Sequence, residues 1–214
     1  MIKRYQFIAY LNGDISADTV NTDVAAVTDC IRLGECLTVA AYRYRNAIFL
    51  YYEALNEELT PDVLLPSLTG MITPAPYATG YLKWKPLTNV YYTFAPESTE
   101  DLIRECRKTR IGKIAYLHRE KIPSYIYYHK ALVDEGLYLG DKYLFISLID
   151  NLLFAYCEEP RINSHIKSEL NEESAVINEW KNQDPRSHFD RTQTDGENNF
   201  LILEPVFTIG KEDL

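Results

Sequence analysis

The chain has 214 residues, a length that allows one large domain or two domains of about 100 residues each. Hydrophobic residues make up 46% of the sequence and charged residues 25%, so the chain can bury a core and is not intrinsically disordered. Its net charge of −9 argues against a surface that binds the phosphates of nucleic acids. No apolar run approaches the roughly 18 residues of a membrane helix, so we expect neither nucleic acid nor a membrane as a partner.

Other sequence signals restrict location and chemistry. Residues 1–14 are basic, but their apolar stretch is too short and too polar to predict a signal peptide. The four cysteines form no CxxC pair and no Asn-x-Ser/Thr sequon occurs, which favours reduced thiols and a cytoplasmic protein. No spacing indicates a zinc site and no glycine-rich loop indicates a phosphate site, so we expect no metal and no cofactor. The 17 tyrosines suit half-buried strands first, and polar ring-shaped ligands second.

In the first half, the spacing of Val20, Val24, Val27 and Ile31 predicts a helix that Gly34 ends. Thr60, Pro61 and Asp62 form a typical start for a second, short helix. Residues 96–110 resemble an amphipathic connecting helix. The predicted strands are 5–11, 37–44, 47–55 and 90–94, with a tight turn at Arg45-Asn46.

The second half has the same order of elements. Ile126, Val133 and Leu137 form the apolar stripe of its first predicted helix, and residues 164–182 form its second. The predicted strands are 113–119, 143–149, 152–158 and 201–209, with a tight turn at Asp150-Asn151.

Three segments repeat in the same order. Residues 8–11 (IAYL) recur as 114–117, residues 46–53 resemble 151–158, and residues 87–91 resemble 203–207. The order β-α-β-β-α-β in each half is the ferredoxin-like unit. We therefore expect an α+β fold with repeats at 1–95 and 111–214, joined by 96–110, forming a dimeric α+β barrel inside one chain.

The second half carries motifs that recur together in one enzyme family. Tyr125-x-x-x-His129 follows Pro123 on the predicted helix, and Tyr143 opens the next strand. Further matches are the hairpin 151–158, Trp180-Lys181 and Val206-Phe207. Through these motifs, residues 112–210 resemble the L-rhamnose mutarotase family.

The resemblance implies an isomerase that interconverts the α and β anomers of a sugar without metal or cofactor. In that reading His129 is the catalytic acid–base residue, and Tyr125, Tyr143 and Trp180 bind the substrate. Opening a pyranose needs one proton delivered and one removed, and an imidazole can do either near neutral pH. A spacing of four residues places Tyr125 and His129 on one helical face.

The sequence departs from the family pattern in several places. The stretch between His129 and Asn151 is shorter, which could move Tyr143 away from the site, and only one tryptophan of the family's pair is present. In the first half, Thr19 and Asp23 align with Tyr125 and His129, and all four histidines lie in the second half. We therefore expect the first repeat to be structural.

Two other readings remain open. The duplicated barrel can be a non-catalytic protein that binds a sugar or another small ligand, or a monooxygenase-like barrel of the same fold. A duplicated barrel satisfies internally the contact that single repeats make by dimerising, so we expect a monomer.

Overall fold

The computed structural model describes every residue except 1, 56–58, 78–79, 168–169, 171 and 195–197. The chain divides into two compact units, each built from antiparallel strands and helices, which confirms the expected α+β class. Unit 1 comprises residues 1–87, 96–108 and 204–214, and unit 2 comprises residues 88–95 and 109–203. The units therefore exchange segments, whereas the boundaries expected from the sequence keep each repeat continuous. Within the described residues, no helix combines the length and apolar character that crossing a membrane requires.

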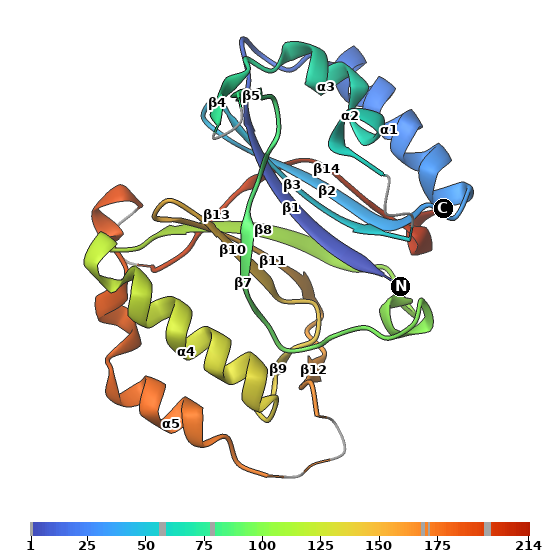
Figure 1. Ribbon diagram of the computed structural model, residues 1–214. Coiled ribbons are helices and arrows are strands. Elements are labelled where there is room, and N and C mark those ends of the chain that lie inside the picture. Colours follow the sequence, from blue (N-terminus) through green and yellow to red (C-terminus); the bar gives the residue numbers. More distant parts are fainter. Residues whose placement is uncertain (1, 56–58, 78–79, 168–169, 171, 195–197) are drawn as a thin grey trace. The chain divides into compact units, whose positions relative to one another are not determined.

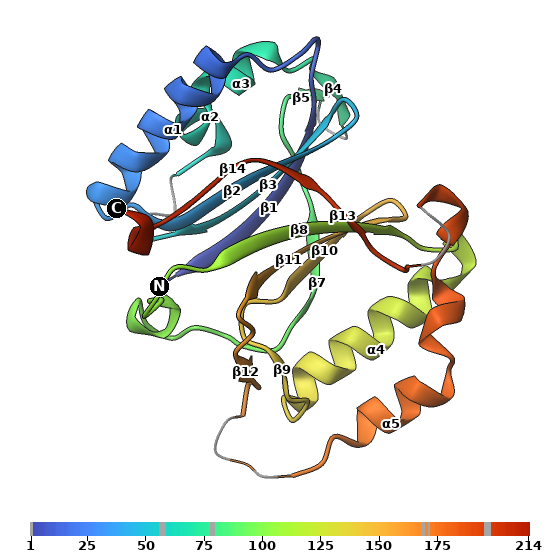
Figure 2. The same cartoon turned by 180° about the vertical axis from the view of Figure 1, so that it is seen from behind.

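The main sheet of unit 1 has the order β14–β2–β3–β1–β6, with every pair antiparallel. Three helices cover one face of this sheet, as Figures 1 and 2 both show, and the apolar core lies between the two layers. The elements are β1 (Lys3–Tyr10), α1 (Ala17–Arg32), β2 (Cys36–Tyr44), β3 (Ala47–Ala54), α2 (Pro61–Leu64), α3 (Pro66–Met71), β6 (Lys85–Pro86) and β14 (Glu204–Gly210), with a small ladder of β4 (Ala75–Tyr77) and β5 (Gly80–Leu82).

The main sheet of unit 2 has the order β13–β8–β11–β10–β7, also antiparallel throughout. Helix α4 covers one face, and α5 lies alongside α4 (Figure 1). The elements are β7 (Thr88–Tyr92), β8 (Thr109–Tyr116), α4 (Ile122–Glu135), β9 (Gly140–Asp141), β10 (Phe145–Ile149), β11 (Leu152–Glu159), β12 (Asn163–Ser164), α5 (Ala175–Asn182) and β13 (Leu201–Ile202), with β9 and β12 paired in a separate ladder.

Helix α1 follows its sequence pattern closely. The Ser16 hydroxyl accepts a hydrogen bond from the Thr19 amide at 3.1 Å and so caps the first turn. Val27 and Ile31 are buried in the core of unit 1. Gly34 has φ = +73°, the left-handed conformation that ends a helix at little cost for glycine.

Helix α4 buries a different face from the one expected. Its buried residues are Tyr125, His129 and Leu132, whereas Ile126 of the predicted stripe is 38% exposed. The aliphatic stripe was a poor guide because it left out Tyr125 and His129, whose rings pack on the inner side of the helix. The motif Tyr-x-x-x-His is thus the inner face of the helix.

The two hairpins form as predicted and share one backbone feature. Arg45 and Asp150, the first residue of each two-residue turn, have φ = 56° and 51°. We expected the asparagine that follows each of them to accommodate such an angle. In both repeats the residue after β1 or β8 then bonds to that asparagine, since the Leu11 and Leu117 amides donate to the Asn46 and Asn151 carbonyls at 2.8 Å. The repetition of this detail supports an internal duplication.

The final strand of each repeat is divided between the two sheets. Lys85–Pro86 pairs with β1 in unit 1, and after Leu87 the chain continues as β7, which pairs with β10 in unit 2. Likewise β13 pairs with β8 in unit 2, and after Leu203 the chain continues as β14, which pairs with β2 in unit 1. The exchange occurs at the same place in each repeat, because Leu87 and Leu203 are the first residues of the third repeated segment.

The prediction of a connecting helix over residues 96–110 is wrong. Its only helical part is a 3-10 turn at Glu100–Leu102, and its last two residues already belong to β8. Two side chains anchor this segment in unit 1. Leu102 is buried, with 1% of its surface exposed, and Arg104 forms a buried ion pair with Glu53 of β3 through contacts of 2.6 and 2.7 Å. The Tyr51 hydroxyl donates to the same carboxylate at 2.8 Å. These buried contacts outweigh the helical propensity.

The helix expected over residues 164–182 is also shorter than predicted. Helix α5 begins only at Ala175, where the Ser174 hydroxyl accepts from the Ile177 amide at 3.1 Å. Residues 163–164 instead form strand β12, and Leu170 is 43% exposed, so the apolar spacing there does not mark a buried face.

We predict that Glu53→Ala lowers the free energy of unfolding by about 3–5 kcal/mol, because Arg104 would remain buried without its counter-charge. Burial alone would raise the pKa of Glu53, but Arg104 and Tyr51 hold it below its ordinary value of 4.5. The carboxylate therefore contributes stability above about pH 4.5, and this contribution is lost as the pH falls through the lowered pKa.

Urea denaturation at pH 7 measures the change. The control is Asp14→Ala, which breaks the exposed ion pair with Arg43 and is expected to cost less than about 1 kcal/mol. Equal losses in the two variants would contradict the role of the buried pair.

Candidate functional site

The centre of the candidate site is the inner face of α4. Pro123 lies in the first turn of this helix, and Gly136, at φ = +72°, ends it by donating its amide to the Leu132 carbonyl at 2.9 Å. The rings of Tyr125 and His129 stack with centroids 3.9 Å apart. His129 Nδ1 donates to the Tyr125 carbonyl at 2.8 Å, and this bond assigns the proton of the neutral ring to Nδ1, leaving Nε2 as an acceptor.

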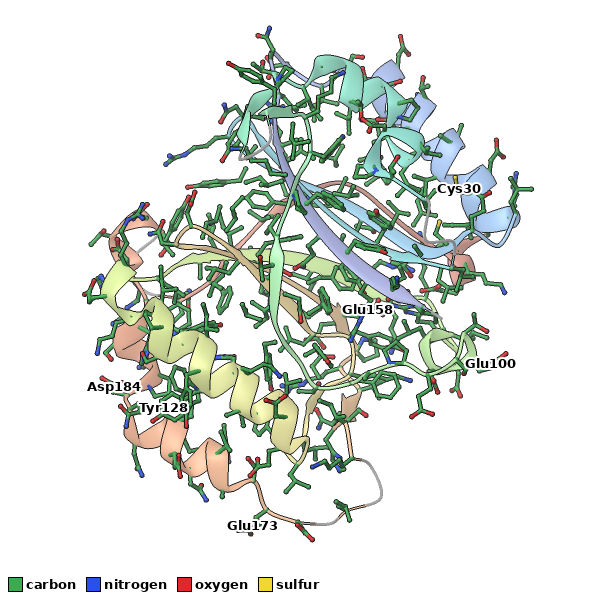
Figure 3. All side chains as sticks on the ribbon, in the orientation of Figure 1. Cys30, Glu100, Tyr128, Glu158, Glu173 and Asp184 are labelled. Carbon is green, nitrogen blue, oxygen red and sulfur yellow. The ribbon has the colours of Figure 1, made fainter. Side chains whose placement is uncertain are left out.

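Trp180 reaches this pair from α5. Its ring meets His129 edge-on at 5.2 Å and Tyr125 at 6.0 Å, and it also contacts Tyr128 at 5.3 Å. Glu135 at the end of α4 fixes the start of α5, because its carboxylate accepts from the Ser174 hydroxyl and from the Ala175 amide at 2.9 Å. Figure 3 shows Tyr128 on α4 and Asp184 just after α5, on the same side of unit 2.

His188, which is not part of the motifs shared with the mutarotase family, packs against Trp180. His188 is 1% exposed and its ring lies 4.6 Å from that of Trp180. Its Nε2 is 2.8 Å from the Ser124 hydroxyl at the start of α4. His188 therefore packs against the aromatic group without lining the cavity described next.

Between the helices and the sheet of unit 2 lies a cavity of about 260 Å³. Drug-sized ligands usually occupy pockets of about 300–1,000 Å³, so this space suits a smaller molecule. Three of the four predicted site residues, Tyr125, His129 and Trp180, line it together. The other lining residues are Tyr91, Leu132, Tyr138, Gly140, Leu144, Ile146, Arg161, Ile177, Pro185, Phe189 and Phe200.

Several polar groups of the cavity have no protein partner. Within the described part of the chain, the hydroxyls of Tyr91, Tyr125 and Tyr138 and the guanidinium of Arg161 make no hydrogen bond. Tyr91 and Tyr125 are only 5% and 1% exposed. Tyr138 is half-buried and Arg161 is exposed, so water can reach these two groups. All four nevertheless line one cavity with largely apolar walls, and a few convergent polar groups in such a pocket are typical of a place that binds a ligand.

Burial also sets the protonation states of the site. It lowers the pKa of His129 to about 4, so the imidazole is neutral at pH 7. It raises the pKa values of Tyr91 and Tyr125, so both phenols remain protonated. At neutral pH the cavity therefore offers hydroxyl donors and one imidazole acceptor.

Tyr143, the fourth predicted site residue, is not among the residues that line the cavity. Strand β10 begins at Phe145, so Tyr143 belongs to the preceding turn rather than to the strand. Its amide donates to the Asp141 carboxylate at 3.0 Å, and its ring lies 5.6 Å from the Lys142 ammonium. The short segment after His129 places residue 143 outside the site.

Three polar lining residues were not predicted from the sequence: Tyr91, Tyr138 and Arg161. Tyr91 comes from the first repeat and enters unit 2 only through the exchange of β7. The sequence signal that includes Tyr91 is the repeated segment 87–91, and this repeat indicates a duplication rather than a binding site. Tyr138 and Arg161 lie in loops next to β9 and β11, where no periodic pattern marks them.

In unit 1 the corresponding position and the polar groups of the neighbouring aromatic side chains are engaged in hydrogen bonds. Asp23, which aligns with His129, is fully buried and accepts the amides of Ser67 and Leu68 at 2.8 and 3.0 Å, so it caps α3. A cavity of about 430 Å³ lies beside Tyr52 and Trp84, but the Tyr52 hydroxyl donates to the Leu59 carbonyl and the Trp84 indole donates to the Thr69 hydroxyl.

Among the described residues, no group of three histidine, cysteine or acidic side chains is arranged to hold a metal ion. No protein-family model matches the sequence, and no curated protein matches it. Function therefore has to be argued from the site itself.

Two solved structures are similar to the chain over nearly its whole length. One is a protein provisionally assigned as a monooxygenase from Lactobacillus acidophilus NCFM, with 8% identity, a TM-score of 0.46, and coverage of 97% of this chain and 96% of that one. The other, with the same provisional assignment, is from Fusobacterium nucleatum subsp. nucleatum, with 10% identity, a TM-score of 0.45, and coverage of 98% and 94%.

We predict that the burial of His129 makes the protein less stable as the pH falls. The folded pKa of about 4 lies below the ordinary value of 6.5, so the unfolded chain takes up the proton first. The stabilisation is complete above about pH 6.5 and falls by on the order of 3 kcal/mol by pH 4.

Urea denaturation of the wild type and of His129→Gln across this pH range tests the prediction. The difference in unfolding free energy between the two proteins is expected to change with pH. Parallel pH profiles would show that His129 is not buried as a neutral imidazole.

Proposed function

We propose that unit 2 binds a small, ring-shaped organic molecule in the cavity between α4, α5 and the sheet. The observation that carries this proposal is the set of unpartnered polar side chains in an otherwise apolar space: Tyr91, Tyr125, Tyr138 and Arg161. The flat rings of Trp180 and of the tyrosines suit a ring held by stacking and edge contacts.

A second candidate is the mutarotase chemistry that the resemblance implies. Its specific support is that His129 Nε2 is an acceptor in a cavity that also contains protonated tyrosine hydroxyls. Such an imidazole would take the proton of the anomeric hydroxyl while a tyrosine donates to the ring oxygen. In this proposal His129 is the catalytic residue, and Tyr125 and Trp180 hold the sugar.

We prefer the binding proposal to the catalytic proposal because of the protonation state of His129. General bases work best when their pKa is near the working pH. A pKa of about 4 makes this imidazole a weaker base than an ordinary histidine. The cavity therefore favours recognition more strongly than it favours proton transfer.

The finer architecture is part of the same proposal. The strand orders β2–β3–β1–β6 and β10–β11–β8–β13 correspond between the units, which supports two ferredoxin-like repeats. We propose that these form the dimeric α+β barrel within one chain, an architecture that a monooxygenase-like barrel would share. A monomeric state and a cytoplasmic location complete the proposal. All four cysteines are free thiols, which agrees with a reducing compartment.

We predict that filling the cavity abolishes binding. Isothermal titration calorimetry with L-rhamnose, D-glucose, phenol and benzoate is expected to show saturable binding of at least one probe to the wild type. Leu144→Trp places an indole in the cavity and is expected to remove that binding. Leu139→Trp, the same change at a 56% exposed position outside the lining, is expected to preserve it. Equal binding in both variants would contradict the assigned site.

We also predict faster anomer exchange of L-rhamnose if the mutarotase proposal holds. Saturation-transfer NMR measures the rate, and His129→Gln is expected to return it to the uncatalysed value while the fold persists. His165→Gln, outside the cavity lining, is the control. A wild-type rate equal to that of buffer would exclude the mutarotase proposal and leave the binding proposal standing.

A further inference from the structure

The charge of the unit 2 cavity is uniform in sign. Among the described residues that line it there is no aspartate, glutamate or lysine, and Arg161 is the one side chain that is ionised at neutral pH. His129, Tyr91 and Tyr125 are neutral there, because burial lowers the pKa of the imidazole and raises the pKa values of the two phenols. A cavity with a single cation and no carboxylate attracts anions and disfavours amines.

Hydrogen bonds fix the backbone around Arg161, whereas its guanidinium makes no hydrogen bond with the described residues. The Arg161 amide donates to the Glu159 carboxylate at 3.0 Å, and the Ile162 carbonyl accepts from the Lys142 amide at 2.7 Å. Glu159 thus bonds to the backbone of Arg161 and forms no ion pair with its guanidinium. Asp141, the nearby buried carboxylate, accepts the Tyr143 amide at 3.0 Å. Burial raises the pKa of Asp141, and the Tyr143 amide and the charge of Arg161 act in the opposite direction, so Arg161 and Asp141 attract each other without forming an ion pair. The guanidinium makes no ion pair with the described residues.

The walls of the cavity indicate the kind of ring. Besides its tyrosines and Trp180, the lining contains two phenylalanines, and Leu132, Leu144, Ile146 and Ile177 add aliphatic surface. A sugar presents a hydroxyl on nearly every ring carbon, and each one buried against such walls would lose a hydrogen bond to water. A planar aromatic ring matches them without that cost.

We propose that the cavity of unit 2 binds a small aromatic carboxylate, whose ring packs against the aromatic and aliphatic walls and whose carboxylate pairs with Arg161. This inference rests on the proposed binding function and specifies its ligand class. The planar guanidinium presents paired N–H donors that match the two oxygens of a carboxylate. The tyrosine hydroxyls and His129 Nε2 remain available for substituents on the ring.

The test compares two probes of nearly the same shape. Benzoate and benzamide differ in charge, and their affinities are measured by isothermal titration calorimetry with the wild type, Arg161→Gln, Arg161→Lys and Arg186→Gln. Arg186 is exposed, lies in the 3-10 turn beside the cavity and does not line it, so it is the matched control.

We expect benzoate to bind the wild type at least about ten-fold more tightly than benzamide, the ratio of one charge-assisted contact. Arg161→Gln should remove this preference without changing benzamide binding, Arg161→Lys should keep part of it, and Arg186→Gln should keep all of it. Because Arg161 is exposed, the preference for benzoate should also decrease with added salt.

The possible failures are distinguishable. Equal affinities of benzoate and benzamide for the wild type, or a benzoate preference that survives in Arg161→Gln, would overturn the carboxylate assignment and leave a neutral-ring site. If neither aromatic probe binds but L-rhamnose does, the aromatic assignment is wrong and the binding proposal stands. If no ring probe binds at all, the proposed function fails as well.

Discussion

The buried pair of Glu53 and Arg104 is the constraint on which the arrangement of the chain depends. After Leu87 the chain leaves the sheet of unit 1 to form β7 in unit 2, and it must return before β8 begins. The returning segment has almost no regular structure of its own. An ion pair closed to water, with Leu102 packed beside it, holds that segment in unit 1. Strand β7, which brings Tyr91 to the cavity, is held in unit 2 by its pairing with β10, and the ion pair fixes where the chain lies after it leaves that strand.

Local elements were predictable from the sequence because their signals are local. The apolar spacing and the glycine of α1 and the turns of the two hairpins lie within a few residues of the elements that they determine. The helix over 96–110 was predicted wrongly because Arg104, a surface residue in that pattern, pairs with a carboxylate far away in the sequence. The strand exchange occurs where the third repeated segment begins, at Leu87 and Leu203. The repeat does not predict the exchange, because contacts between residues far apart in the sequence determine which sheet a strand joins.

The part of the candidate site that lies on a single helix was predictable from the sequence. Tyr125 and His129 belong to a single motif, whereas Tyr91, Tyr138 and Arg161 come from a strand of the other repeat and from two loops. The contrast between the repeats is chemical. At the position of His129, unit 1 has Asp23, whose carboxylate is fully used in capping α3. Unit 1 thus uses this position for folding, whereas in unit 2 the His129 ring lines a cavity.

The exchange of edge strands also affects how the chain can be divided. A cut after residue 95 would leave a first fragment that lacks β14 beside β2, and a second fragment that lacks β7 beside β10. Each fragment would carry an open sheet edge together with the strand that the other one needs, and open edges seek such partners. The two halves of the coding sequence are therefore complementary pieces rather than independent modules. If two intact chains exchanged these edge strands with each other, they would form a domain-swapped dimer without any new contact surface.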